Sequence, residues 1–320
     1  MYSNSKLSER LWKIARFLIL TGLCFVILYP LIYMISCAFR AQEDMHDPTV
    51  MWIPRHVTFD ILKQTMKAMD FWHTLGNTVL LNIGCSLVQV IACAVTGYGF
   101  ARFQFKGQKL LFGIVIMMIL VPHQILAIPQ YMEFRHCFGI EPLMQKLAQQ
   151  GKISSSFAQA FNFIDTPLTM YLPALSANGI RAGLMIFLFR QFFRGIPREL
   201  EDAAYLDGCG AFRTFLQVML PNAGSAILTV FLFSVVWYWN DYYVSSTFFT
   251  NNQTIALMLK NLDTQLTRTI FHTTTAEISP REKIIWMEAG CLLAVTPLLI
   301  LYICMQKYFV EGIERSGLAG

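Results

Sequence analysis

Long apolar segments recur along the whole of this 320-residue sequence, and they constrain its fold more than any other feature. Six of them reach the roughly 20 helical residues needed to cross a hydrocarbon core of about 30 Å. They lie at 17–39, 75–100, 110–130, 168–193, 222–246 and 285–308. Only 14% of the residues are charged, against roughly 25% in an ordinary soluble domain. The sequence therefore predicts an all-α protein of the lipid bilayer with about six transmembrane helices.

The distribution of lysine and arginine predicts the orientation of these helices, because cytoplasmic loops carry an excess of both. Only Arg40 follows the first segment closely, whereas several basic residues precede it: Lys6, Arg10, Lys13 and Arg16. Six crossings return the chain to its starting side, where the loops near 102–109 and 190–213 are also basic. We therefore expect both termini to be cytoplasmic.

Polar residues inside apolar segments mark positions that avoid lipid. Arg181 in the fourth segment either lines a translocation cavity or marks a break in the helix. The fifth segment ends in a group of aromatic and polar residues: Trp237, Trp239, Asn240 and Asp241. Such a group suits a sugar, whose ring face stacks on aromatics while its hydroxyls need hydrogen-bond partners. It also suits an interfacial aromatic belt with a helix-end cap, and both interpretations stay open.

The segment 196–221, between the fourth and fifth apolar segments, predicts a helix, a turn and a second helix. Pro197 suits a first helical turn, and acidic side chains just after it complement the positive end of the helix dipole. Gly208 supplies a residue able to take positive φ where the first helix stops. The second helix is expected to end at Pro221, since proline cannot continue the backbone ladder. A structured loop of this kind suits docking onto a partner protein.

This segment resembles the EAA loop of binding-protein-dependent ABC importer permeases, which forms a coupling helix in a cleft of a separate ATPase subunit. The family's usual glutamate is Asp202 here, so the charge is kept on a side chain one methylene shorter. The resemblance implies a role in ATPase coupling for six residues: Asp202, Ala203, Ala204, Asp207, Gly208 and Pro221.

Further motifs narrow the resemblance to MalG-like permeases of carbohydrate importers. They are Asn77-Thr78, Tyr98–Phe103, Phe189–Phe193, Trp239–Asp241 and Gln306–Ile313. The resemblance implies the type I ABC importer permease fold, with three parts. These are 1–70, holding the cytoplasmic N-terminal segment, first helix and outer loop; 71–309, the transmembrane domain; and 310–320, a cytoplasmic tail.

The same resemblance implies the setting in which the chain works. It implies the plasma membrane of a prokaryote and a sugar or related solute brought by an extracytoplasmic binding protein. It also implies a homologous second permease and two ATPase subunits. The solute, and whether this chain itself contacts it, stay open.

Other classes of function are weighed by the motifs that they need. No G-x-x-x-x-G-K-[ST] loop occurs, so we expect no catalysis and no cofactor in this chain, with ATP and Mg bound by the partner ATPase. The six histidines lack metal-ligand spacing, and the scattered net charge of +5 does not suggest nucleic acid. A secondary transporter or channel, a membrane-embedded enzyme, and an importer permease for a non-sugar solute stay as alternatives.

Overall fold

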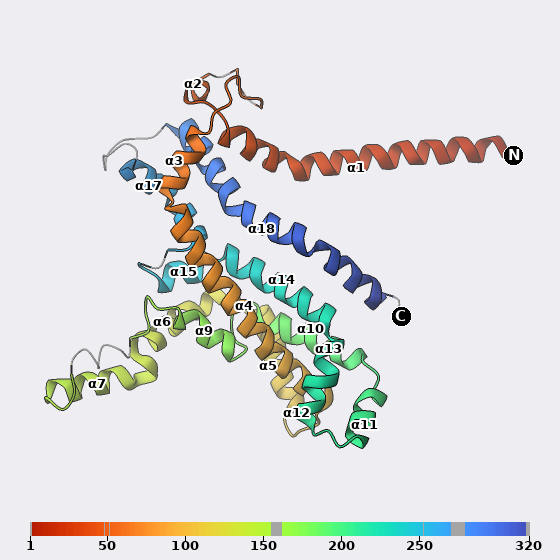
Figure 1. Ribbon diagram of the computed structural model, residues 1–320, viewed down its shortest axis with the longest axis vertical. Coiled ribbons are helices and arrows are strands. Elements are labelled where there is room, and N and C mark those ends of the chain that lie inside the picture. Colours follow the sequence, from red (N-terminus) through yellow and green to blue (C-terminus); the bar gives the residue numbers. More distant parts are fainter. Residues whose placement is uncertain are drawn as a thin grey trace. The chain divides into compact units, whose positions relative to one another are not determined.

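The structure is a computed structural model that describes residues 2–47, 49–50, 52–154, 162–251, 253–269 and 279–317. Every regular element in these ranges is a helix (Figure 1). A helix satisfies its backbone polar groups within one segment, which is what a chain this apolar needs in lipid. The all-α membrane fold expected from the sequence is confirmed.

The chain forms two compact units, which are described separately. The first unit comprises Met1–Phe71 and Leu259–Pro297, and the second comprises Trp72–Met258 and Leu298–Gly320. The resemblance divides the chain differently, into 1–70, 71–309 and 310–320. That division is based on the expected role of each part and not on compactness, and it stays a prediction.

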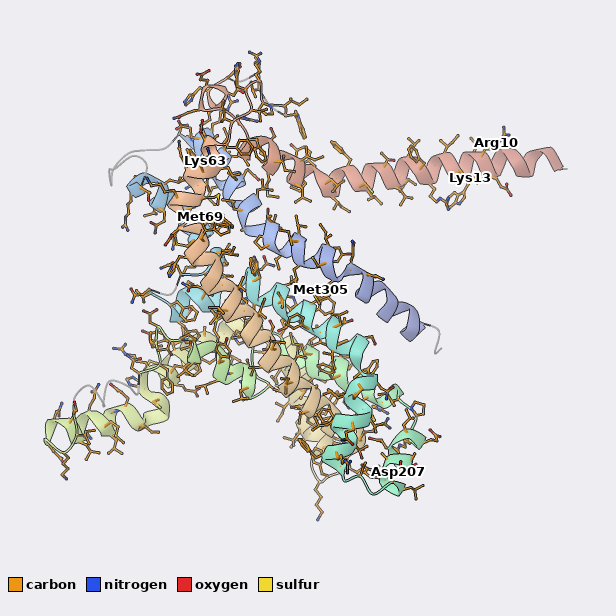
Figure 2. The ribbon with its side chains drawn as sticks, in the orientation of Figure 1. Arg10, Lys13, Lys63, Met69, Asp207 and Met305 are labelled. Carbon is orange, nitrogen blue, oxygen red and sulfur yellow. The ribbon has the colours of Figure 1, made fainter. Side chains whose placement is uncertain are left out.

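The first unit is built around two long helices and the segment that follows the first of them. Its elements are α1 (Tyr2–Ala38), α2 (Gln42–Met45), α3 (Asp60–Ala68), α17 (Leu262–Thr269) and the beginning of α18 (Pro280–Gly317). α17 packs against α3. Arg10 and Lys13 lie on the N-terminal half of α1 (Figure 2). The segment 39–59 is closed by an antiparallel bridge between Arg40 and Val57.

The second unit holds the remaining helices. In chain order they are α4 (Phe71–Arg102), α5 (Gln108–Leu120), η1 (His123–Leu126), α6 (Ala127–His136), η2 (Cys137–Gly139), α7 (Ile140–Gln149), α9 (Leu168–Leu175), α10 (Ala182–Gly195), α11 (Glu199–Leu206), α12 (Ala211–Thr214), η3 (Phe215–Met219), α13 (Leu220–Asn222), α14 (Gly224–Asn240), α15 (Tyr243–Phe248) and α16 (Ile255–Lys260). α10 packs against both α5 and α14.

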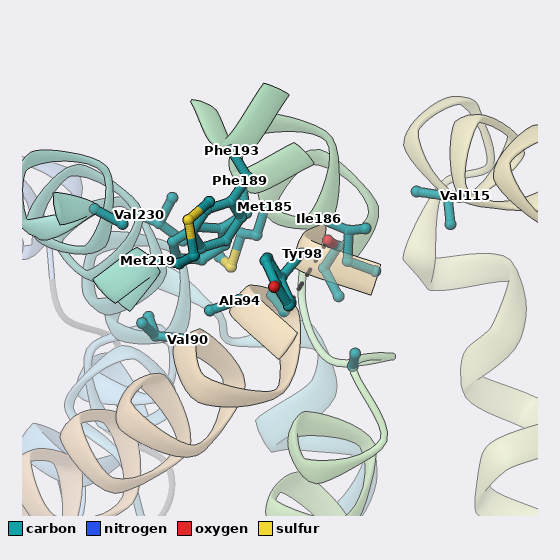
Figure 3. Packing of buried hydrophobic residues seen from close by; sticks show 14 of the residues in the cluster. Val90, Ala94, Tyr98, Val115, Met185, Ile186, Phe189, Phe193, Met219 and Val230 are labelled. Atoms are coloured by element: carbon teal, nitrogen blue, oxygen red, sulfur yellow. Dashed lines mark hydrogen bonds between the residues drawn. The ribbon is translucent and has the colours of Figure 1, made fainter. Parts of the chain in front are cut away.

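One buried cluster organises the end of the second unit that carries α11 and α12. Figure 3 shows Tyr98 of α4 gathered with Met185, Phe189 and Phe193 of α10 and with Met219 of η3. Phe189, Phe193, Met185 and Met219 are completely buried. The C-terminal part of α4 is therefore fixed by packing to α10, which precedes the 196–221 segment, and to η3 within that segment.

The expected spans are present as helices, but not all are straight. Three helices are long and apolar enough to cross a membrane alone: Glu9–Ala38, Phe71–Arg102 and Pro280–Lys307. Two bent pairs raise the number to five: Gln108–Leu120 with His123–Gln149, bent by 102°, and Ala211–Asn222 with Gly224–Asn240, bent by 79°. The remaining expected span, 168–193, consists of α9 and α10 with a break at 176–181.

Each interruption has a local cause. Val121 is extended because it precedes Pro122, so α5 ends at Leu120. Positive φ values at Ala177 and Arg181, 54° and 58°, separate α9 from α10. Neither residue is a glycine. Their backbone nevertheless has the left-handed conformation, which a right-handed helix cannot include.

The second helix of the 196–221 segment differs from expectation at its end. It does not stop at Pro221 but continues to Asn222 through α12, η3 and α13. η3 is a π-helical turn directly before α13, in which Pro221 lies in the first turn. The widened turn accommodates a residue without an N–H group, so the chain bends after the proline instead of at it. The polar stretch 146–160 lies only partly in the described residues, where α7 ends at Gln149.

Candidate functional site

The expected helix, turn and helix are present in the 196–221 segment. α11 carries acidic residues in its first turn, and Gly208 follows it with φ of +79°. The N–H of Gly208 donates to the carbonyl of Tyr205 at 3.0 Å, and that of Cys209 donates to Ala204 at 2.9 Å. These bonds satisfy carbonyls at the end of α11, and only glycine adopts the required φ without strain. Gly208 therefore closes α11 as its position in the sequence predicts.

Most of the residues expected to meet an ATPase lie on the outer face of this segment. Asp202, Ala203, Asp207 and Gly208 are exposed, and Figure 2 shows Asp207 where α11 ends. Pro221 is also exposed but lies further along, in α13. Ala204 is buried and faces the core instead.

Two large apolar side chains extend the exposed face. Leu206 is 89% exposed at the end of α11, and Phe212 is 74% exposed in α12. Apolar side chains gathered beside a carboxylate on a rigid helix are typical of a protein-docking surface. We name the surface formed by Asp202, Ala203, Leu206, Asp207 and Phe212 the coupling face.

The opposite face of α11 is held by a buried polar group that sequence reasoning missed. Glu201 is 7% exposed, and its Oε1 accepts a hydrogen bond of 2.9 Å from the hydroxyl of Tyr98. Its Oε2 lies 3.2 Å from Nε of Arg102. This contact is an ion pair without hydrogen-bond geometry at Nε, whereas Nη2 of Arg102 donates a hydrogen bond to the carbonyl of Ile196 at 2.5 Å. We name Tyr98, Arg102 and Glu201 the α4–α11 joint.

A signal for this joint exists in the sequence. Glu201 and Ala204 are three residues apart, so they share one helix face, and that face points inward. Tyr98 and Arg102 lie within the Tyr98–Phe103 motif, for which the sequence alone indicated no contact. Which of the acidic residues at 199, 201 and 202 turns inward depends on the entry angle of α11, and only the structure supplies that angle.

A second site is a cavity of about 460 Å³ beside the interrupted spans. It is lined by the end of α5, by η1, by the break before α10 and by the start of α15. Its polar lining residues are His123, Gln124, Asn178, Arg181, Asp241 and Tyr243. Arg181 therefore ends the break, as one interpretation of the sequence predicts, and it also lines this cavity; its place on a translocation path stays a prediction.

The residues expected along the solute path are only partly brought together. Arg181 and Asp241 line the cavity, whereas Trp237, Trp239 and Asn240 are absent from its described lining. Trp239 is buried, and Trp237 stacks on Phe233 with ring centroids 5.6 Å apart. The side-chain amide of Asn240 donates to the carbonyl of Val236 at 2.9 Å.

Asp241 also has a structural role. Its Oδ2 accepts a hydrogen bond of 3.1 Å from the backbone N–H of Ser245, in the first turn of α15. A carboxylate in this position caps a helix N-terminus. Asp241 therefore caps the start of α15 and lies in the cavity wall, while the aromatic belt weighed for this group stays a prediction.

The break that lines the cavity is held by two buried side chains. Gln89 of α4 donates from Nε2 to the carbonyl of Ile180 at 2.8 Å. Its Oε1 accepts a hydrogen bond of 2.6 Å from the hydroxyl of Tyr238 on α14. A Cβ at Gly179 would collide with both Gln89 Oε1 and the Tyr238 hydroxyl, so this position requires glycine. The broken helix is thereby supplied with the partners that lipid cannot provide.

Comparison with known proteins identifies the family. A family model described as "Binding-protein-dependent transport system inner membrane component" matches residues 89–315, well over half of the chain. The arabinooligosaccharides transport system permease protein AraQ of Halalkalibacterium halodurans is 26% identical over 93% of both chains. The maltodextrin transport system permease protein MdxG of Bacillus subtilis is 24% identical over 99% of this chain and all of the relative.

A third relative and a solved structure agree with this family. The diacetylchitobiose uptake system permease protein DasC of Streptomyces coelicolor is 24% identical over 92% of both chains. A bacterial ABC transporter that imports the acidic polysaccharide alginate has a chain that matches with a TM-score of 0.70 at 19% identity. The match covers 94% of this chain and 98% of the other, so the two share their fold.

The family decides between the importer and the alternatives of a secondary transporter, a channel or a membrane-embedded enzyme. Its members are transport components of the inner membrane, which agrees with the apolar helices and gives a multi-pass protein of the plasma membrane. The chain belongs to the binding-protein-dependent transport system inner membrane component family, and it is the permease of an importer that works with a solute-binding protein and a separate ATPase.

Proposed function

We propose that this permease imports a sugar, with an oligosaccharide as the favoured class. The support is that AraQ, MdxG and DasC are named for arabinooligosaccharides, maltodextrin and diacetylchitobiose. A polyol, glycerol phosphate or modified glycan is the competing solute class. Uptake assays in whole cells with labelled oligosaccharides test the proposal, and uptake of none of them while a polyol is taken up would overturn it.

The coupling face of α11 is the contact with the ATPase, and this surface is the observation that carries the mechanism. A carboxylate at Asp202 and apolar side chains at Leu206 and Phe212 are exposed on a helix whose other face is fixed. An arginine of the ATPase would pair with Asp202 in a charge-assisted contact of about 1.5–3 kcal/mol. ATP-driven closure of the ATPase would then displace α11 and open the bundle outward.

The assembly contains a homologous second permease and two ATPase subunits. The family description, an inner membrane component of a transport system, supports the presence of further membrane partners. The solute path runs past Arg181 and Asp241, whose charged groups line the cavity with His123 and Asn178.

The coupling role is tested in the importer reconstituted with its ATPase and its loaded binding protein. Asp202→Ala removes the carboxylate, and loss of about 1.5 kcal/mol at this contact corresponds to about a tenfold weaker association. Gly208→Val places a β-carbon at a φ that strains it by about 1–2 kcal/mol. Both variants should insert into the membrane and lose most of the ATPase stimulation caused by the binding protein.

The matched control for this test is Asp202→Glu, which restores the family residue and should be nearly silent. Stimulation equal to that of the unchanged chain in both Asp202→Ala and Gly208→Val would refute the coupling role. Loss of stimulation in Asp202→Glu as well would mean that side-chain length, and not charge, decides the contact.

A further inference from the structure

We infer that the α4–α11 joint, formed by Tyr98, Arg102 and Glu201, transmits motion of the coupling helix to α4. The three side chains are positioning residues: none of them belongs to the described lining of the cavity or to the five residues of the coupling face. This inference rests on the proposed coupling role of α11, and it names the contact by which that role reaches the bundle.

The joint is needed because α11 is connected to the helices before and after it by short nonhelical segments. α10 ends at Gly195, and Ile196 is extended before α11 begins at Glu199. On the other side, residues 207–210 form a turn before α12. A helix held only by two short nonhelical segments would rotate when pulled, without moving α4. α11 also packs against α12 and η3, and the joint adds the contacts that fix α11 and the carbonyl of Ile196 to Arg102 of α4.

Burial makes the joint stiff. The side chains of Arg102 and Glu201 are 7% and 9% exposed. A buried carboxylate and a buried guanidinium separate only at a large desolvation cost, because each would be left as an uncompensated charge. The Tyr98 hydroxyl adds a charge-assisted hydrogen bond to the same carboxylate. The Tyr98 ring is itself fixed between Phe193 and Phe215, with centroid distances of 5.5 and 4.9 Å.

α4, the helix to which the motion is passed, is continuous. α4 runs without interruption from Phe71 to Arg102, so a displacement at Arg102 is carried along one helix. Near its middle, Gln89 holds the carbonyl of Ile180, and Ile180 lines the 460 Å³ cavity. A chain of direct contacts therefore leads from Glu201 to the cavity wall. The test measures the energetic coupling along this chain of contacts directly.

The test uses the complete reconstituted importer and four variants of the joint, of which Tyr98→Phe leaves the charges unchanged and the other three alter them. Glu201→Gln keeps an acceptor for Tyr98 but removes the charge, Arg102→Gln removes the partner charge, and the third variant combines both. Glu199→Gln and Lys106→Gln are matched controls, since both residues are exposed. Four quantities are compared: ATPase co-purification, basal hydrolysis, stimulation by loaded binding protein, and solute transported per ATP.

We expect the joint variants to retain ATPase co-purification within twofold of the unchanged chain. Stimulation and solute transported per ATP should each fall at least fivefold in both single variants. The double variant should be no worse than the worse single one, because both substitutions break the same contact. Tyr98→Phe loses one hydroxyl at nearly constant volume, so its stimulation should fall between two- and fivefold.

Several outcomes would overturn the inference while the proposed function stands. One is loss of ATPase co-purification in Glu201→Gln to the degree seen in Asp202→Ala, since Glu201 would then belong to the docking contact. Another is normal stimulation in the joint variants while Asp202→Ala is impaired. Multiplying losses in the double variant would show two independent effects. If the charge variants fail to accumulate, Tyr98→Phe decides, and normal stimulation there overturns the inference.

Failure of the proposed function has a separate signature. Normal coupling in both Asp202→Ala and Gly208→Val would remove the coupling role of α11, whatever the joint variants do. The inference would then fall with it.

Discussion

Gln89 is one of several polar residues in the long helix α4, and the chain break opposite it explains its presence. The break before α10 exposes the carbonyl of Ile180, which Gln89 satisfies. The Tyr238 hydroxyl in turn satisfies Gln89 Oε1, so two buried side chains replace the partners that an unbroken helix would have supplied. An amide and a hydroxyl do this without introducing a charge into the membrane.

Tyr238→Phe should destabilise the protein although it changes only one hydroxyl. The substitution leaves Gln89 Oε1, on a residue with no exposed surface, without the tyrosine donor. An unsatisfied buried acceptor costs about 1–3 kcal/mol. Thermal unfolding of the purified protein in detergent measures this cost. Tyr302→Phe is the control, since Tyr302 is exposed; equal unfolding temperatures for the two variants would contradict the role given to Tyr238.

Single residues were predicted from the sequence when one local rule decided their role. Gly208 follows from helix-stop chemistry, and its positive φ is confirmed. For Arg181 the sequence offered a helix break and a cavity position as alternatives, and it did not predict that one residue would occupy both. Glu201 was missed because it lies beside Asp202 in a run of acidic residues, and composition does not tell which one turns inward. That choice depends on Tyr98 and Arg102, about one hundred positions away in the chain.

At the scale of helices, hydropathy predicts where the long apolar segments lie but does not predict where a helix is interrupted within them. The segment 110–130 reads as one apolar run, yet α5 ends before Pro122 and the chain turns sharply. In 168–193 the apolar residues continue on both sides of 176–181, so hydropathy averages over the break. Sustained helices such as α4 and α18 are predicted well because their apolar length is enough for a membrane span, although α18 contains Pro297.

The stability of the segment 39–59 in the first unit should depend on pH through the carboxyl group of Asp44. The backbone N–H of His56 donates to Asp44 Oδ2 at 2.8 Å and, with the nearby imidazole Nδ1, holds the pKa of this carboxyl below its usual range. A carboxyl with a lowered folded-state pKa stabilises the protein above its unfolded pKa of about 3.9. That contribution is lost as the pH falls through the lower, folded-state pKa.

Thermal unfolding of the detergent-purified protein between about pH 3 and pH 6 tests this dependence. Asp44→Ala should unfold at a lower temperature than the unchanged chain at pH 6, and the gap should narrow towards pH 3. Glu43→Gln, an exposed neighbour, serves as control and should leave the pH profile unaltered. A gap that stays constant across the range would show that Asp44 acts through packing and not through its charge.

At the scale of the whole molecule, the fold and the family followed from the spacing of apolar segments and from one loop motif. What they left open is how many of the segments cross the membrane. By length and composition the described helices give three spans, or five with the bent pairs, whereas the sequence predicts six. An odd number places the termini on opposite sides of the membrane, and an even number places them on the same side. The broken segment formed by α9 and α10 decides the parity.

We predict that both termini are cytoplasmic, because basic residues precede the first span and α9 with α10 completes a sixth crossing. Cysteine labelling tests this prediction. Single cysteines are introduced into a variant that lacks the native cysteines, and intact cells are treated with a membrane-impermeant maleimide. Ser5→Cys, Leu206→Cys and Leu318→Cys should react only after permeabilisation, and Val57→Cys should react at once; position 318 lies outside the described residues. Labelling at Leu318→Cys but not at Ser5→Cys in intact cells would show an odd number of crossings, in which case the α9 to α10 segment enters and leaves the membrane on the same side.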